Sequence, residues 1–264
     1  MNSEKIIKDI EQICQEGGKF IRENFNKITD SDIIVKEKNS LVSYVDQEAE
    51  IMITSKLSTL LPEAGFLTEE GTVKNSDKSF RWIVDPLDGT TNFIAGIPHF
   101  SISIALEENS DILLGAVYNV MTDDFYHAIK GKGAFVNGNA IKVSETERLD
   151  NAIIATGFPY DKSRISESLQ KILLHYVTKS RALRRLGSAA LDLCFTAQGT
   201  FDLYYETTLN PWDIAAGILI VEEAGGKVND FNGNRDYLSN GEVIAAGMGM
   251  NNEVKWIIDN WLQK

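Results

Sequence analysis

Residues 82–93 read WIVDPLDGTTNF, and they restrict the fold of this chain more than any other stretch. The apolar run before Asp85 is typical of a buried strand. Pro86 fixes the backbone and turns the chain, so that Asp88 can converge on the same point as Asp85. Because layered α/β proteins bind ligands where strands end beside helix starts, the pattern predicts such a fold with a ligand site here. Asp-Pro and Asp-Gly are also common turn dipeptides, so a purely structural turn is the alternative.

The residues after Asp88, Gly89-Thr90-Thr91-Asn92, can open a helix. The first backbone N–H groups of a helix have no partner within it, and they readily bind phosphate. A pair of carboxylates beside such a phosphate site is explained if a divalent cation lies between them. The formal net charge of the chain is −12, so this cation would also supply the positive charge that an anionic substrate needs.

The residue types near this stretch favour Mg²⁺ or Mn²⁺ over other metals. The three histidines, His99, His127 and His175, have no ligand-like spacing, and there is no Cys-x-x-Cys motif, which argues against zinc. Oxygen ligands in an acidic cluster suit Mg²⁺ or Mn²⁺. The spacing does not fit a calcium loop of the EF-hand type. A haloacid dehalogenase phosphatase is also excluded, because Pro86 occupies the position of its nucleophilic aspartate.

Two further acidic positions are candidates for the same site. Glu69 and Glu70 follow a short apolar stretch, although a pair of glutamates is usually a solvated turn. Asp213 follows Asn210-Pro211-Trp212, near the start of an expected helix. Taken alone, Asp213 is better explained as a residue that complements the helix dipole and cap.

Composition and charge exclude several classes of function. An acidic chain is poorly suited to nucleic-acid backbones or anionic membranes as main partners. Cys14 and Cys194 lie in helix-like apolar patterns and are expected to be free, buried thiols. The charged N-terminal residues do not resemble a signal peptide, and the longest apolar run, Ala215–Val221, is too short to span a bilayer. We therefore expect a cytoplasmic protein.

The pattern of apolar residues changes near residue 145. Residues 1–145 predict two helices followed by a long antiparallel run of strands, an α+β part that carries most of the candidate ligands. Residues 146–264 predict alternating strands and helices, an α/β part that completes the site. There is no repeat, low-complexity segment or Pro/Ser-rich linker between them, so we expect the two parts to pack tightly.

Three separated motifs together resemble the inositol monophosphatase family of Mg²⁺-dependent, lithium-sensitive phosphatases. They are Glu69-Glu70-Gly71, residues 82–93, and Trp212–Gly217 with the Glu-Ala-Gly-Gly that ends at Gly226. Their order and separation fit over essentially the whole chain. Thr68 stands where the family usually has glycine. The resemblance implies a five-layered αβαβα sandwich and, commonly, a homodimer.

The resemblance also implies a set of metal ligands. Glu69, Asp85 and the carbonyl of Leu87 would hold one ion, and Asp85, Asp88 and Asp213 would hold a second. Glu69 would also touch a weaker third ion. The implied cofactor is therefore two or three Mg²⁺ ions, with Mn²⁺ as a substitute.

The remaining site residues are implied in the same way. The N–H groups of Gly89 and Thr90 would bind the phosphate, and Asp46 and Thr90 would help to orient the attacking water. Glu206 would contact substrate hydroxyls. The same pocket would be lined by Gly187, Ser188 and Ala189. The basic residue that precedes Asp46 in the family corresponds to Lys36 or Lys38, and Asn210 stands where some animal members carry histidine.

The expected function is hydrolysis of a small phosphomonoester, with inositol monophosphates as the leading substrate. Within the same enzyme class, the alternatives are NADP(H), fructose 1,6-bisphosphate and 3′-phosphoadenosine 5′-phosphate. The loop 156–168 could shape room for the larger of these. A non-catalytic binding or regulatory protein that keeps the fold is an alternative of a different class.

Overall fold

The computed structural model describes residues 3–28, 33–37, 40–74, 76 and 78–262, and for residues 33–37 and 40–42 it describes the backbone alone. Lys38 and the side chain of Lys36 therefore lie outside the described residues. A two-stranded sheet of β1 (Ile33–Glu37) and β2 (Ser40–Ser43) lies between the first two helices of the chain.

The first large sheet has seven strands in the order β3-β4-β5-β6-β7-β8-β9. β3 runs parallel to β4, and each later pair of neighbours is antiparallel. The strands are β3 (Gly65–Thr68), β4 (Phe80–Asp88), β5 (Ser101–Glu108), β6 (Asp111–Asn119), β7 (Asp124–Ile129), β8 (Ala134–Val136) and β9 (Asn139–Ala140).

The second sheet has five strands in the order β11-β10-β12-β14-β13. β10 is parallel to both of its neighbours, whereas β14 is antiparallel to β12 and β13. The strands are β10 (Ile153–Thr156), β11 (Ala182–Arg184), β12 (Leu203–Thr207), β13 (Lys227–Asn229) and β14 (Glu242–Ala246). Three short strands of three or four residues, β2, β3 and β11, were not predicted from the apolar pattern.

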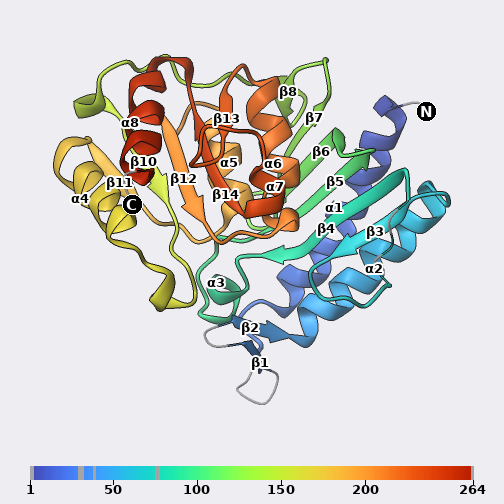
Figure 1. Cartoon of the computed structure of the whole chain (residues 1–264). Coiled ribbons are helices and arrows are strands. Elements are labelled where there is room, and N and C mark those ends of the chain that lie inside the picture. Colours follow the sequence, from blue (N-terminus) through green and yellow to red (C-terminus); the bar gives the residue numbers. More distant parts are fainter. Residues whose placement is uncertain (1–2, 29–32, 38–39, 75, 77, 263–264) are drawn as a thin grey trace.

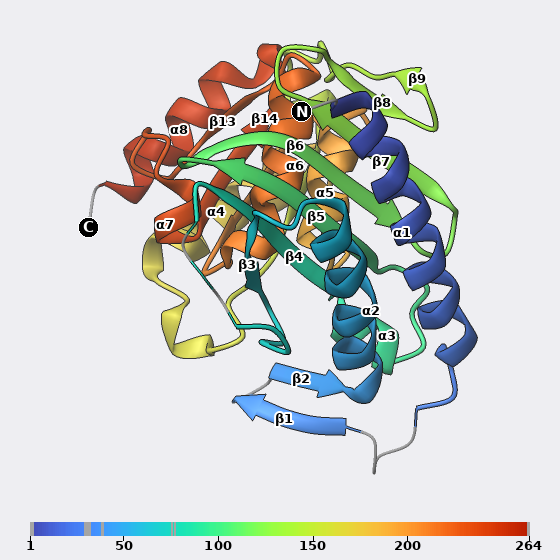
Figure 2. The same ribbon diagram turned by 90° about the vertical axis from the view of Figure 1, so that its right-hand side faces the viewer.

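The helices complete five layers in the order αβαβα. On the outer face of the seven-stranded sheet lie α1 (Ser3–Asn24) and α2 (Tyr44–Leu60), which stand in front of β4, β5 and β6 in Figure 2. Between the two sheets lie α5 (Ala189–Ala197) and α6 (Pro211–Glu223), and α4 (Glu167–Lys179) and α8 (Asn251–Trp261) cover the far face of the second sheet (Figure 1). The fold class expected from the sequence is confirmed.

The short helices lie in the connections between these layers. They are α3 (Thr90–Ile94), α7 (Tyr237–Asn240) and the 3₁₀ turns Leu149–Asn151, Lys162–Arg164 and Met248–Met250. The second helix, α2, begins at Tyr44, because Ser43 is its N-cap. No helix among the described residues is long and apolar enough to cross a membrane.

Three apolar cores separate the layers. Successive residues of β4 face different cores: Trp82 packs under α1 and α2, and Ile83 packs against α5 and α6. The apolar run Ala215–Val221 is buried on all sides, since α6 lies between two sheets. Cys14 and Cys194 are buried free thiols, as expected.

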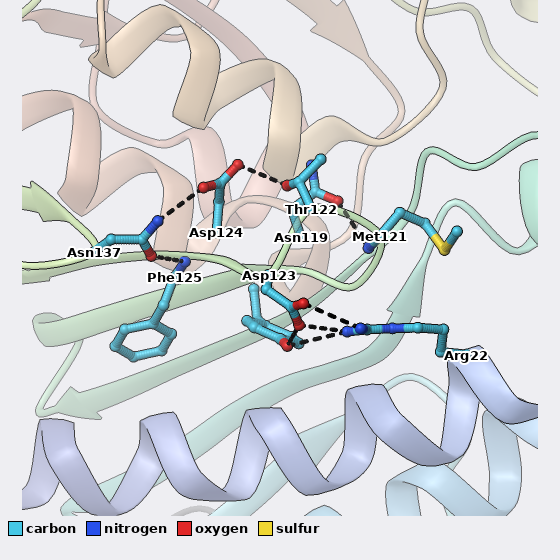
Figure 3. A network of polar contacts seen from close by, with 9 residues as sticks. Arg22, Asn119, Met121, Thr122, Asp123, Asp124, Phe125 and Asn137 are labelled. Carbon is cyan, nitrogen blue, oxygen red and sulfur yellow. Dashed lines mark hydrogen bonds and ion pairs between the residues drawn. The ribbon is translucent and has the colours of Figure 1, made fainter.

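Gly18 in α1 is explained by close packing on Tyr118 of β6. A Cβ atom at Gly18 would lie 2.4 Å from the ring of Tyr118, so only glycine allows this approach. At the end of α1, the Arg22 guanidinium donates to both carboxylate oxygens of Asp123, at 2.5 and 3.1 Å (Figure 3). The Tyr118 hydroxyl donates to the same carboxylate. These contacts fix the β6–β7 turn to the helix layer, on the far side of the sheet from α6.

Candidate active site

A β-bulge in β4 brings Asp85 and Asp88 to one face of the sheet. In a regular strand, residues three positions apart point to opposite faces. Here Asp85 pairs with Ser103 and Asp88 pairs with Ser101, so β4 advances three residues while β5 advances two. The extra residue reverses the alternation, and both carboxylates face the α5–α6 layer. Pro86 lies within the bulge, where its missing N–H costs no regular ladder hydrogen bond.

One oxygen of Asp88 is held by the start of α5. Its Oδ2 accepts from the hydroxyl of Ser188, from the N–H of Ala190 at 2.9 Å and from the hydroxyl of Ser101 at 3.4 Å. Burial nevertheless raises the pKa of Asp88 to about 6. Ser188 itself is fully buried behind the carboxylate, so its hydroxyl is a support for Asp88.

Asp85 is almost completely buried, and other acidic side chains surround it. Its Oδ1 accepts from the N–H of Leu87 at 2.9 Å. Burial and then the charge of its neighbours, led by Glu69, raise the pKa of Asp85 well above its ordinary value. Such mutual repulsion is the electrostatic state that a bound cation relieves.

Asp213 approaches the same point from the C-terminal half of the chain. It is the third residue of α6, and its Oδ2 accepts from the N–H of Asn210, the N-cap, at 2.7 Å. Burial, followed by the charges of Glu69 and Asp88, raises the pKa of Asp213 well above its ordinary value. Asp213 therefore both caps its helix and belongs to the carboxylate group.

Gly89 and Thr90 form the turn between β4 and α3. Gly89 has a φ of +98°, and a Cβ atom there would lie 3.1 Å from the carbonyl oxygen of His99, so the turn requires glycine. The Thr90 hydroxyl lies 2.9 Å from Asp46 Oδ1 and 3.0 Å from the carbonyl oxygen of Leu87, and it can donate to either. Burial raises the pKa of Asp46, which also accepts from Ser43 at the start of α2.

Asp85, Asp88, Gly89, Thr90 and Asp213 line one cavity of about 650 Å³, whereas Asp46 and Ser188 lie outside its lining. Glu206, at the end of β12, lies in its wall and accepts from the Tyr204 hydroxyl at 2.7 Å. Burial raises the pKa of Glu206 to about 7. The exposed side chain of Arg185 lines the same cavity, as does the loop from Gly157 to Arg164. Of the site residues expected from the sequence, the lining includes Glu69, Asp85, Leu87, Asp88, Gly89, Thr90, Gly187, Ala189, Glu206 and Asp213.

A model of the inositol monophosphatase family matches residues 2–260 of this chain. The chain belongs to this family. It is 41% identical over 236 residues to an inositol-1-monophosphatase from Mesorhizobium japonicum, and the match covers 89% of each chain. It is 43% identical over 234 residues to a protein named Nus factor SuhB from Vibrio cholerae, with 88% of each chain covered.

A solved structure of this family has the same architecture. The extragenic suppressor protein suhB from Bartonella henselae superposes with a TM-score of 0.91 at 36% sequence identity. The superposition covers 96% of this chain and 98% of that one, so both sheets and all five layers are shared.

The donor set of this family member suits a hard divalent cation. Across the described residues, no group of three or more His, Cys, Asp or Glu side chains is arranged to hold an ion as it stands. Six carboxylates nevertheless line the cavity, from Glu69, Asp85, Asp88, Asp161, Glu206 and Asp213, and the described residues of its lining include no histidine or cysteine. Carboxylate and carbonyl oxygens, without nitrogen or sulfur donors, fit Mg²⁺ or Mn²⁺.

Two residues that shape this site could not be predicted from the sequence. Glu50, on α2, is fully buried and accepts hydrogen bonds from the segment that carries Glu69. Ser101, on β5, supports Asp88. Neither residue lies in a motif, and the partners of both are distant in sequence, so no local pattern predicts their roles.

Proposed function

We propose that this protein hydrolyses phosphomonoesters in a Mg²⁺-dependent reaction, and that inositol monophosphates are its substrates. The observation that carries the proposal is the convergence of Asp85, Asp88 and Asp213 on one cavity. Buried like charges are costly, so their gathering is explained by a function that needs them. Family membership and the name of the Mesorhizobium relative support the same reaction.

The proposed ligands are Glu69, Asp85, the carbonyl of Leu87, Asp88 and Asp213, which would hold two or three Mg²⁺ ions, with Mn²⁺ as a substitute. When bound, such ions neutralise the charge of a phosphate and lower the pKa of water. The chain itself contributes an array of oxygen donors fixed by the β4 bulge and by two helix starts. Preorganised groups of this kind lower the cost of reorganisation during reaction.

Thr90, Asp46 and Glu69 are the proposed catalytic residues. Thr90 and Asp46 would orient the attacking water, and Glu69 would hold a metal ion. Because the Thr90 hydroxyl can donate its proton to Asp46, its lone pairs remain free to accept a hydrogen bond from a water. The N–H groups of Gly89 and Thr90 are proposed to bind the phosphate. In this arrangement backbone N–H groups of the turn hold the phosphate, and the paired side chains of Thr90 and Asp46 hold the water.

Glu206 is proposed to accept hydrogen bonds from hydroxyl groups of a polyol substrate. It lines the cavity on the side of the second sheet, and Tyr204 fixes one of its oxygens. NADP(H), fructose 1,6-bisphosphate and 3′-phosphoadenosine 5′-phosphate are the alternative substrates, which the loop from Gly157 to Arg164 would have to accommodate.

A substrate panel tests this proposal. Phosphate release from inositol 1-phosphate, fructose 1,6-bisphosphate, NADP⁺ and 3′-phosphoadenosine 5′-phosphate is measured with Mg²⁺ and with excess EDTA. The expected result is the highest kcat/KM for inositol 1-phosphate, with no turnover in EDTA. Full turnover in EDTA would contradict the metal-dependent reaction, and a higher kcat/KM for another compound would reassign the substrate.

A non-catalytic binding or regulatory role is the second candidate. The name Nus factor SuhB of the Vibrio relative favours such a role beside, or instead of, hydrolysis. The same panel separates the two, because a purely regulatory protein releases no phosphate from any substrate in Mg²⁺.

We further propose that the protein is a homodimer and that Li⁺ inhibits it. Analytical sedimentation would test the oligomeric state, and the phosphate-release assay would test the inhibition.

A further inference from the structure

Glu50 is a buried carboxylate with no part in the proposed reaction. It lies on α2 with 0% of its surface exposed. Its oxygens accept four hydrogen bonds: from the hydroxyl of Thr68 at 3.1 Å, from the N–H of Glu70 at 2.7 Å, and from both the N–H and the hydroxyl of Thr72 at 2.7 Å. All four donors belong to one short segment, which begins at the end of β3.

That segment carries Glu69, one of the proposed metal ligands. The N–H of Glu69 donates to the carbonyl oxygen of Val84 at 3.3 Å, which continues the pairing of β3 with β4 by one residue. Beyond that point the chain leaves the sheet, and loops that leave a sheet are usually mobile. Here the next anchor is the Glu50 carboxylate, whose charge strengthens each hydrogen bond that it accepts.

α2 thus contacts the segments that follow both β3 and β4, the strands that supply Glu69, Asp85 and Asp88. Asp46 and Glu50 are four residues apart in the helix, so they lie on the same face. Asp46 accepts from Thr90 after β4, and Glu50 accepts from Glu70 and Thr72 after β3. Two buried carboxylates on one helix therefore fix two loops relative to each other.

We propose that Glu50 is a positioning residue, which holds the loop after β3 so that the Glu69 carboxylate stays directed at the proposed metal site. This inference rests on the proposed function, because it assigns to Glu69 the role of a ligand. Glu50 itself does not line the cavity that would hold the metal and the substrate. Supports of this kind typically change metal affinity or activity by roughly 10- to 100-fold when they are removed.

Glu50→Gln is the sharpest test, because it keeps the size of the side chain. A glutamine amide has one acceptor oxygen and an NH₂ group that cannot accept from a backbone N–H. At least one of the N–H groups of Glu70 and Thr72 therefore loses its partner. The matched control is Thr54→Val, one turn further along α2. Thr54 is also buried, but its hydroxyl donates only to carbonyl oxygens of its own helix.

Two readouts are taken on the full chain: Mg²⁺ affinity by isothermal titration calorimetry, and hydrogen exchange of the metal-free protein. For Glu50→Gln we expect Mg²⁺ binding weaker by roughly 10- to 100-fold. We also expect faster exchange at the amides of Glu70 and Thr72. Thr54→Val should leave Mg²⁺ affinity unchanged. If Glu50→Gln does not fold, Thr72→Val serves instead, because this exposed residue loses one hydroxyl donor and should weaken Mg²⁺ binding to a smaller degree.

The outcomes separate this inference from the function on which it rests. Wild-type Mg²⁺ affinity in Glu50→Gln, or in Thr72→Val if that variant is needed, overturns the positioning role while leaving the proposed function intact. Equal losses of affinity in Glu50→Gln and Thr54→Val also overturn it, because they would show a general effect of disturbing α2. A wild-type protein that binds no Mg²⁺ overturns both proposals.

Discussion

Asp46 and Asp213 occupy the same position in two different helices. Each is the third residue of its helix, and each accepts the backbone N–H of the N-cap residue, Ser43 at 2.8 Å and Asn210 at 2.7 Å. Both carboxylates use Oδ2 for this hydrogen bond. A carboxylate has a second oxygen, and that of Asp46 accepts from Thr90. Capping a helix and serving a site are therefore compatible roles for one side chain, so the two interpretations of Asp213 need not compete.

Asp213→Asn should abolish most activity without destabilising the fold. The amide oxygen of asparagine can still accept the hydrogen bond from the N–H of Asn210. The negative charge of the Asp213 carboxylate, and with it the ability to bind a cation, is lost. We expect kcat to fall by roughly 100-fold or more. The melting temperature of the metal-free protein should hold or rise, because one repelling charge is removed. A variant that unfolds but retains normal specific activity per folded molecule would show Asp213 to be only a helix-start residue.

The position of the carboxylates could be predicted from sequence because it depends on local chemistry. The apolar strand, Pro86 and Gly89 are neighbours in the chain, and each restricts the backbone on its own. The prediction that Asp88 converges on Asp85 is confirmed by the bulge. The layer order, in contrast, came from a resemblance to a family, since periodicity alone does not say which helix covers which sheet.

The supports of the site could not be predicted in this way. Ser188 lies 100 residues from Asp88, and Glu50 lies 22 residues from Thr72. Such contacts produce no periodicity in the sequence, because a buried serine or glutamate cannot be distinguished by its type from an exposed one. Ser188 was expected in the pocket lining, yet it lies outside that lining and its hydroxyl donates to the carboxylate of Asp88.

The metal-free protein should become more stable as the pH falls from about 7.5 to about 5. The pKa of Asp88 in the folded chain is about 6, above its ordinary value, so the folded state holds the proton more tightly than the unfolded state. The stabilisation is complete below the unfolded pKa, near 4, and is lost as the pH rises through about 6. We expect a gain on the order of 1 to 3 kcal/mol in the free energy of unfolding.

Denaturant unfolding at several pH values, with EDTA present, measures this effect. Asp88→Asn is the control, because it keeps the acceptor for Ser188 and Ala190 but removes the titrating group. Its unfolding free energy should vary less with pH than that of the wild type. Identical pH profiles for the two proteins would show that Asp88 is not the group responsible.

Gly157→Ala should alter substrate preference more than metal dependence. A Cβ atom at Gly157 would lie 2.0 Å from the carboxylate oxygens of Glu206, so alanine must displace that side chain. Glu206→Ala should change the ranking of substrates in the same direction, and Tyr204→Phe, which removes one hydrogen bond to Glu206, should have a smaller effect. Relative kcat/KM values across the substrate panel measure the ranking. Weakened Mg²⁺ affinity with an unchanged ranking would place Glu206 with the metal ligands instead.

Thr90→Val tests whether the hydroxyl, rather than the backbone turn, contributes to catalysis. Valine keeps the branched shape, so the N–H groups at the turn should still bind phosphate, while the hydrogen bond to Asp46 is lost. We expect kcat to fall strongly with a modest change in KM, the sign of an interaction made mainly in the transition state. A large rise in KM with unchanged kcat would instead assign Thr90 to ground-state binding.

Asp46→Asn completes the test, because the two side chains should act as one unit. Its amide oxygen can still accept the N–H of Ser43, so the cap of α2 survives; loss of a helix cap would cost about 1 kcal/mol of stability. Asparagine can also direct its NH₂ group at the Thr90 hydroxyl, which can no longer donate there, and kcat should therefore fall. In the double mutant the loss should be little worse than in the worse single mutant, because the second change removes an interaction that is already broken. Fully multiplicative losses in kcat would refute the coupled pair, and an unchanged kcat in Asp46→Asn would leave that residue with its capping role alone.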